Sequence, residues 1–512
     1  MAMINKFNPF SDFITSARYK EYDYDIQNGK AIIPEWETEI KEEAFEDCKE
    51  LTSVEFPLWI KKIGDYAFSG CENLTEITLP EWVEEIGEWA FGDCENLKSI
   101  DLPRWVKKIG QSAFSGCSSL TSITIPESVT EIGRYAFHGC SSLTSITVSK
   151  ENKFYDSRED CNAIIHTESN TLISGCKNTI IPLSVTEIGY EAFDGCSSLM
   201  SITIPPSVTE IGSSAFEDCS SLTSISIPPS VTKIGNRALD GCSSLTNITI
   251  PPSVTEIGEY AFRDCSGLTS ITIPSSVTEI GEDAFEHCTS LTSISIPESV
   301  TKIGGWAFYH CSSLTSISIP ESVTKIGYNA FRGCSSLTSI TIPSSVTEIG
   351  EGAFSGCESL TSISVSKDNK FYDSREDCNA IIHTESNTLI SGCKNTIIPP
   401  SVTQIGEDAF YGCSSLTSVS IPPSVTEIGK YAFYDCSSLT SITIPESVTK
   451  IGESAFRYCS SLTSISIPSS VTEIDNEVFS GCSSLTEVRI PKGCNVDDGA
   501  FSNCPNVQII RY

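Results

Sequence analysis

Apolar and polar residues follow a pattern that returns every 23 residues along most of the chain. In the unit that begins at Cys117, CSSLTSITIPESVTEIGRYAFHG, the apolar residues Leu120, Ile123 and Ile125 stand among serines and threonines. This alternation predicts a short strand with one buried face. Pro126 ends the strand, because proline has no N–H to donate to a strand ladder.

The second half of the unit predicts a return path for the chain. Val129 and Ile132 are expected to point inward. Gly133 suits a backbone conformation that a residue with a Cβ resists. We expect the following segment to form a single helical turn that places Ala136 and Phe137 in the core.

One such coil has no second layer against which to bury its apolar side chains, so coils must stack on one another. The pattern therefore predicts an α/β repeat solenoid, a right-handed arc of about twenty coils. It would carry a continuous parallel β-sheet on one face and short helical turns on the other. The cysteines recur with the same period and form a column in this stack.

A longer segment interrupts the period twice. The stretch Asn152–Pro182 recurs letter for letter as Asn369–Pro399, and in each copy CNAIIHT and TLISGC predict a β-hairpin with His166 opposite Thr171. Lys153, Tyr155 and Arg158 are expected to decorate a protruding knob. We divide the chain into an N-terminal arm or cap (1–28), repeats with a tryptophan column (29–148), an irregular hairpin coil (149–182), central repeats (183–365), a second irregular hairpin coil (366–399), and C-terminal repeats with a cap (400–512).

The unit CxxLxxIxIPxSVTxIGxxAFxxC resembles the repeat of BspA-like leucine-rich repeat surface proteins, also called the treponemal type. The resemblance covers residues from about Gly29 to the C-terminus, and the irregular coil is similar to the longer coil of that family. It implies a leucine-rich-repeat fold and a non-catalytic binding protein at a bacterial or protist surface. Adhesion to host matrix proteins or to other cells is the role that the resemblance suggests.

Composition limits the partners. The chain has 33 basic and 66 acidic residues, a formal charge of −33, which repels nucleic acid and anionic membranes. Its apolar runs are shorter than a membrane-spanning helix requires, so we expect no membrane insertion. The N-terminal residues contain no apolar run of signal-peptide length. We expect the protein at the cell surface or secreted if an export signal was removed, and otherwise in the cytoplasm.

The residues that carry chemistry predict neither an enzyme nor a cofactor. His287-Cys288 and His310-Cys311 lie one period apart, but the cysteines should point inward and the histidines outward, which separates these ligand types. The column cysteines are expected to be reduced and structural. Within the irregular coils the alternative stays open, and the candidate disulfides are Cys161 with Cys176 and Cys378 with Cys393.

Two surfaces are candidates for binding. The strand face is nearly uniform in serine and threonine and should satisfy its own hydrogen bonds. The two residues after each glycine vary, and they include the candidate contacts Tyr135, Tyr260, Trp306, Tyr328 and Tyr431. We therefore expect a specific protein partner to contact this edge, while a glycan or another sheet would suit the strand face.

The first four coils carry a tryptophan column, Trp36, Trp59, Trp82 and Trp105. Flanking charges alternate from coil to coil, as in Lys62 and Glu85, and opposite charges on adjacent strands support register. The column is either covered by the aromatic N-terminal arm or free for a partner or self-association. The arm residues are Phe7, Phe10, Phe13, Tyr19 and Tyr22.

The primary hypothesis is thus an adhesin-like protein that recognises a protein or surface polymer through the extended solenoid surface. The alternative is a structural protein that self-assembles through its terminal coils or the tryptophan column. A metal-dependent hydrolase built on the repeated block at 152–182 is the weakest hypothesis.

Overall fold

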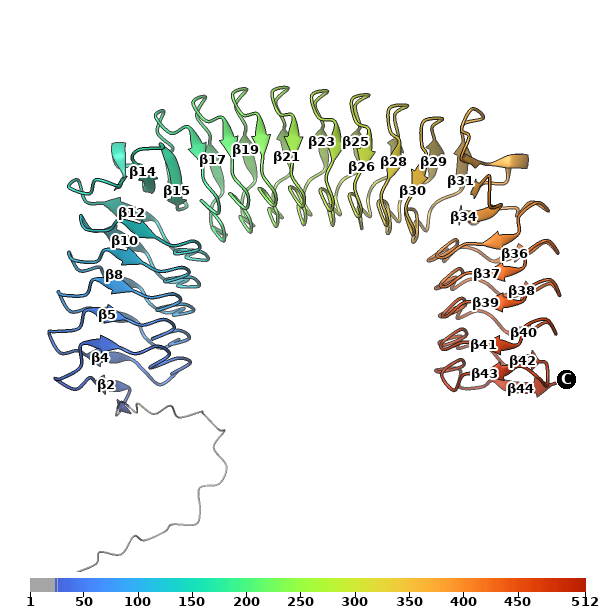
Figure 1. Cartoon of the computed structure of the whole chain (residues 1–512), viewed down its shortest axis with the longest axis horizontal. Helices are drawn as coiled ribbons and strands as arrows, with labels where there is room; N and C mark the ends of the chain where they lie inside the picture. The colour runs from blue at the N-terminus through green and yellow to red at the C-terminus, as the bar shows by residue number, and fades with distance from the viewer. Residues whose placement is uncertain (1–23, 25) are drawn as a thin grey trace, which may run out of the picture. The chain divides into compact units, whose positions relative to one another are not determined.

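The structure is a computed structural model that describes Tyr24 and residues 26–512 (Figure 1). It is a β-solenoid of about 21 coils of roughly 23 residues, which confirms the predicted repeat and the stacked parallel strands. Contacts divide the chain into two units. The first contains the residues up to Leu143 together with Val148–Asn152, and the second contains Thr144–Thr147 and Lys153–Tyr512.

Each coil contributes two strands, so two parallel ladders run along each unit where one sheet was predicted. We call them the long-strand ladder and the short-strand ladder. In the first unit, the long strands are β2 (Lys30–Ile32), β4 (Ser53–Glu55), β6 (Glu76–Thr78), β8 (Ser99–Asp101) and β10 (Ser122–Ile125). The short strands are β3 (Glu39–Ile40), β5 (Lys62–Ile63), β7 (Glu85–Ile86), β9 (Lys108–Ile109) and β11 (Glu131–Ile132). β1 (Ile26–Gln27) pairs antiparallel with β2, and β12 (Ser145–Val148) has residues in both units.

The second unit repeats this arrangement. Its long strands are β17 (Ser201–Thr203), β19 (Ser224–Ser226), β21 (Asn247–Thr249), β23 (Ser270–Thr272), β25 (Ser293–Ser295), β27 (Ser316–Ser318), β29 (Ser339–Ile342), β31 (Ser362–Val365), β36 (Ser418–Ser420), β38 (Ser441–Thr443), β40 (Ser464–Ser466), β42 (Glu487–Ile490) and β44 (Gln508–Arg511). Its short strands are β16 (Glu187–Ile188), β18 (Glu210–Ile211), β20 (Lys233–Ile234), β22 (Glu256–Ile257), β24 (Glu279–Ile280), β26 (Lys302–Ile303), β28 (Lys325–Ile326), β30 (Glu348–Ile349), β35 (Gln404–Ile405), β37 (Glu427–Ile428), β39 (Lys450–Ile451), β41 (Glu473–Ile474) and β43 (Asn495–Val496). Hydrogen bonding divides these ladders into sheets of two to seven strands.

The irregular coils contain the predicted hairpin, which joins the short-strand ladder. The first contains β13 (Tyr155–Asp156), the 3₁₀ segment η1 (Arg158–Asp160), β14 (Ala163–His166) and β15 (Thr171–Gly175). The second contains β32 (Tyr372–Asp373), η2 (Arg375–Asp377), β33 (Ala380–His383) and β34 (Thr388–Gly392). His166 lies opposite Thr171, and β15 then pairs in parallel with β16, so the hairpin returns the chain to the stack.

The alternation of apolar and polar residues fixes the register of the long strands. Ile271 of β23 pairs with Ile294 of β25, and both side chains are buried, whereas Ser270 and Ser293 lie opposite each other on the exposed face. A slip by one residue would move every isoleucine to the solvent face. The 23-residue period therefore keeps each apolar position above its equivalent.

A column of stacked phenylalanine rings forms the centre of the core. In the second unit, Phe285 is fully buried between Phe262 and Phe308, with ring centroids 5.4 Å away on each side. Leu239 takes the place of a phenylalanine in one coil. The column cysteines lie beside these rings, and most of their thiols donate to the phenylalanine carbonyl of the preceding coil, as Cys288 does to Phe262 at 3.2 Å. Cys265 donates instead to Leu239 O, at 3.2 Å.

The predicted helical turn is wrong. Ala136 and Phe137 are buried as expected, but no α-helix forms within residues 26–512. Instead, alternate N–H groups donate to the next coil: Phe285 donates to Ala307 O at 2.8 Å and His287 to Tyr309 O at 2.8 Å. These N–H groups are not available to the carbonyl four residues earlier, which an α-helix requires.

The N-terminal end of the core column is covered by an aromatic side chain. Tyr24 stacks on Phe45 with ring centroids 5.1 Å apart. Burial raises the pKa of Tyr24 to about 12. The five aromatic residues of the predicted cap lie outside the described residues.

Candidate functional site

The segment of each coil between the glycine after the short strand and the next column cysteine forms what we call the turn face. Tyr135, Tyr260, Trp306 and Tyr431 lie on it with φ of 58°, 59°, 51° and 52°. This left-handed conformation is unusual for a large side chain and costs on the order of 1–2 kcal/mol. Backbone hydrogen bonds between coils stabilise this conformation: the N–H of Trp306 donates to Tyr328 O at 2.9 Å.

Tyr260 lies between two arginines. The guanidinium of Arg237 is 4.4 Å from its ring centroid, and that of Arg263 is 5.2 Å away. Both distances are within the range of cation–π attraction. The predicted contact residue is therefore one member of a cluster that spans two neighbouring coils.

The buried carboxylate of Asp240 forms ion pairs with both arginines of this cluster. Asp240 is almost fully buried, and its carboxylate pairs with Arg263 at 2.6 Å and Arg237 at 3.2 Å. Burial raises the pKa of Asp240 to about 6, and the two arginines oppose this shift. Sequence inspection missed Asp240 and Arg263. The signal available was their place in the two variable positions before the column cysteine.

The next coils place aromatic and imidazole rings together. Trp306 and Tyr328 pack edge to face with centroids 4.7 Å apart, and Tyr328 is exposed. The rings of His287 and His310 are 5.5 Å apart. Within the described residues, no group of three or more histidine, cysteine or acidic side chains is placed to hold a metal ion. His287 instead contacts Asp264 at 3.1 Å.

A second aromatic cluster lies on the turn face after the second irregular coil. Tyr411 and Tyr434 stack 4.7 Å apart, and Tyr434 packs edge to face against Tyr431 and Tyr458. Arg332, from a coil before the irregular one, lies 4.0 Å above Tyr411. Of these residues only Tyr431 was predicted. The tyrosines come from consecutive coils, and because the irregular coil loops out of the stack, Arg332 lies close to Tyr411.

The tryptophan column is exposed among the described residues. The exposed fraction falls from 80% at Trp36 to 60% at Trp59, 46% at Trp82 and 40% at Trp105. The last two indoles stack with centroids 6.1 Å apart. The alternating charges predicted beside the column form ion pairs, such as Lys107 with Glu84 at 2.6 Å. Whether the arm covers the column or a partner binds it stays a prediction.

The irregular coils are organised by one arginine each. Arg375 donates to both carboxylate oxygens of Asp373, at 2.8 and 2.6 Å, to Asn387 at 2.8 Å and to Ser401 at 3.2 Å. Arg158 makes the equivalent contacts in the first copy. Tyr155 is buried. The predicted knob is thus wrong for Tyr155 and Arg158, which hold the coil together.

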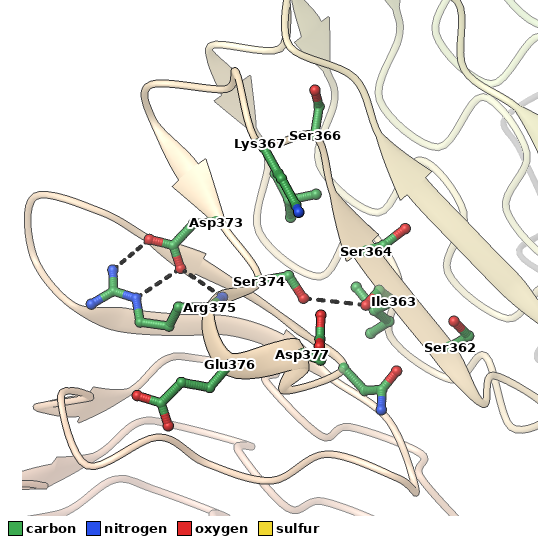
Figure 2. Close-up of a pocket in the computed structure, with 12 residues that line it drawn as sticks. Ser362, Ile363, Ser364, Ser366, Lys367, Asp373, Ser374, Arg375, Glu376 and Asp377 are labelled. Atoms are coloured by element: carbon green, nitrogen blue, oxygen red, sulfur yellow. Dashed lines mark hydrogen bonds and ion pairs between the residues drawn. The ribbon is translucent and has the colours of Figure 1, made fainter.

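A cleft opens beside the second irregular coil, between β31 and the segment that contains η2 (Figure 2). Its volume is about 620 Å³, and its lining is mostly polar. Ser362 and Ser364 line it from the strand, and Lys367, Glu376 and Asp377 line it from the loop. Sequence inspection did not identify this cleft, because its two walls are separated by a turn whose path the pattern does not determine.

The four cysteines proposed as disulfide partners are free thiols in the structure. Cys161 donates to Ala163 O at 3.8 Å and Cys176 to Asn162 O at 3.4 Å. Cys378 and Cys393 make the corresponding contacts. Burial raises the pKa of the Cys161 thiol to about 11. The pairing stays a prediction that a thiol count can test.

Comparison with known proteins agrees with the repeat. The model of the BspA type leucine rich repeat region matches residues 38–160, 170–292, 255–375 and 386–508. A leucine rich cell surface protein from Faecalibacterium prausnitzii is 32% identical, with 71% of this chain and 96% of that chain covered and a TM-score of 0.55. A leucine-rich repeat protein from Eubacterium ventriosum is 29% identical (53% and 73% covered, TM-score 0.48), and one from Bacteroides ovatus is 26% identical (98% and 100% covered, TM-score 0.35). No curated protein matches the chain.

Proposed function

Because the chain belongs to the BspA-type leucine-rich repeat family, we propose that it is a non-catalytic, adhesin-like binding protein that acts at a cell surface. Its partner would be a protein or a surface polymer, such as a host matrix component. The F. prausnitzii relative is described as a cell surface protein, which supports this location. Among the described residues, no helix is long and apolar enough to cross a membrane.

The aromatic and arginine clusters of the turn face support this proposal most. Tyrosine, tryptophan and arginine dominate the residues that carry binding energy in protein interfaces. Here they gather around Tyr260, around Trp306 and Tyr328, and around Tyr434. Several of these residues, such as Tyr260, Trp306 and Tyr431, adopt a strained left-handed backbone conformation. Their rings lie on the turn face and are not part of the buried phenylalanine column.

A binding assay with purified chain and immobilised matrix proteins tests the proposal. Tyr328→Ala removes an exposed ring that packs against Trp306, and we expect it to weaken binding about tenfold or more, as hot-spot residues do. Met200→Ala removes an exposed apolar side chain away from the turn face and serves as the control. A soluble, folded chain that binds none of the matrix proteins, or a Tyr328→Ala variant that binds equally well, would refute this assignment.

Self-assembly is the second candidate function. The exposed tryptophan column favours it. Light scattering over a concentration series would show growing mass. The double variant Trp59→Ser with Trp82→Ser should abolish that growth if the column carries the contact.

A further inference from the structure

The cleft beside the second irregular coil has the chemistry of a small-molecule site. Its volume of about 620 Å³ falls within the range of about 300–1,000 Å³ that such sites occupy. Figure 2 shows Ser362 and Ser364 along β31, with Asp377 facing the same space and Lys367 extending toward it. One wall therefore offers hydroxyl groups, and the other offers a carboxylate and an ammonium group.

Some polar groups of the lining already have partners. Asp373 and Arg375 pair with each other, and Ser374 Oγ donates to Ile363 O at 3.3 Å. Ser364 Oγ shares a hydrogen bond with Thr341 Oγ1 at 2.9 Å, which leaves the remaining hydrogen-bonding capacity of its hydroxyl for a ligand. In contrast, Lys367, Glu376 and Asp377 form no ion pair with any residue in the described part of the chain. All three side chains are exposed, and Figure 2 shows Lys367 and Asp377 directed toward the cleft, whereas Glu376 points away from it.

The charges of these available groups select the class of ligand. Asp377 is the carboxylate that shares the cleft with the Lys367 ammonium group, and the chain has a formal charge of −33, so an anionic ligand is repelled. A neutral saccharide fits, because its adjacent hydroxyls donate to Asp377 and accept from Lys367 and the serines. An ion pair with a charged ligand would gain little in a cleft this open to water.

The internal duplication supports a ligand. Asn152–Pro182 and Asn369–Pro399 are identical, including the exposed residues Glu376 and Asp377 and their equivalents. Exposed positions just beyond the block differ between the copies, as in Leu183 and Pro400, Tyr190 and Glu407, or Met200 and Thr417. Exposed side chains that only face water are free to differ, as these do. A shared ligand requires the same groups in both copies.

We propose that the cleft formed by β31 and the η2 segment binds a short neutral saccharide. Asp377 and Lys367 hold its hydroxyls from one wall, and Ser362 and Ser364 contact it from the other. This site is separate from the turn face, so it goes beyond the binding function proposed above.

The test uses the full chain and a panel of neutral trisaccharides (maltotriose, cellotriose and chitotriose) with trigalacturonate as the anionic counterpart. All variants carry Asp160→Gly, so that the first copy of the block does not mask the second. Calorimetry and saturation-transfer NMR should show saturable binding of at least one neutral trisaccharide. Asp377→Gly should weaken it by about tenfold or more, the loss expected for a charge-assisted hydrogen bond. Asp377 has φ of 49°, which glycine adopts without strain, so the fold is preserved.

Two controls match these changes. Asp435→Gly removes another exposed acid at positive φ (52°), and Lys370→Ala removes an exposed lysine of the same coil that does not line the cleft. Both should leave affinity unchanged, whereas Lys367→Ala should reduce it. The proposal is overturned if no neutral trisaccharide binds, if trigalacturonate binds more tightly, or if binding survives Asp377→Gly. Loss of matrix binding by Tyr328→Ala with intact saccharide binding would separate the two functions.

Discussion

Replacing Phe285 by leucine removes one ring from the middle of the phenylalanine column and keeps an apolar side chain of similar size. Phe285 is fully buried and stacks on Phe262 and Phe308 at 5.4 Å each. A stacked aromatic pair contributes about 0.5–1.5 kcal/mol beyond the area it buries, so losing two pairs should cost about 1–3 kcal/mol. Leu239 already occupies the same position in another coil, which indicates that leucine is compatible with the fold.

Hydrogen exchange is the suitable assay, because long repeat arrays need not unfold in a single step. Amides between residues 262 and 308 should exchange about 5- to 150-fold faster in Phe285→Leu, the factor that corresponds to 1–3 kcal/mol. Phe501→Leu is the comparison variant: within the described residues Phe501 stacks on Phe479 alone, at 5.3 Å, and is partly exposed, so the local effect should be about half or less in free energy. Equal exchange in Phe285→Leu and the parent chain would refute the view that stacked rings couple neighbouring coils.

Three further predictions concern the second unit. Burial raises the pKa of Asp408 from 3.8 to about 6, so the folded state binds the proton more tightly than the unfolded state, and this group's contribution to stability should fall as pH rises from about 4 to 6. Thermal unfolding of Asp408→Asn should therefore show a weaker loss of melting temperature over that pH window than the parent chain; an unchanged slope contradicts the assignment. Arg375→Ala should destabilise the irregular coil by about 1–3 kcal/mol, because it removes charge-assisted hydrogen bonds of a partly exposed pair with Asp373, and limited proteolysis should then cut near η2, whereas a Lys370→Ala chain stays intact. A thiol assay in denaturant should count 23 reactive cysteines, and a count four lower would establish the two hairpin disulfides.

The repeat and its core were predictable because each inward position recurs with one period, and a stack is the only way to bury such a pattern. Phe137, Ile132 and the column cysteines are buried or partly buried accordingly. The turn segment was not predictable in the same way. Its residues have helical propensity, but their N–H groups form hydrogen bonds with the next coil instead of within a helix. These bonds depend on the neighbouring coil, so the sequence of one coil does not predict them.

The site residues that vary between coils were predictable from the sequence, whereas those defined by contacts between coils were not. Tyr260 and Trp306 were recognised because they vary between coils, which is visible in one sequence. Arg263, which lies over Tyr260, and Asp240, which pairs with Arg263, were missed, because a contact between neighbouring coils is not visible in the sequence of one coil. The cleft lined by Asp377 was missed for the same reason, since η2 brings its walls together only after the chain has folded.

The threonines just before the long strands show why these positions of the strand face are poor candidates for recognition. Thr292 Oγ1 donates to Thr269 O at 3.2 Å, and Thr315 repeats this contact with Thr292 at 3.3 Å. A hydroxyl that donates along the stack stabilises the next coil and has less capacity left for a partner. Changing one such threonine would disturb two coils, which keeps the face uniform. The exposed side chains of the turn face and the irregular coils are not needed for such a regular ladder of hydrogen bonds between coils. These positions can therefore hold the aromatic, cationic and acidic groups that recognition requires.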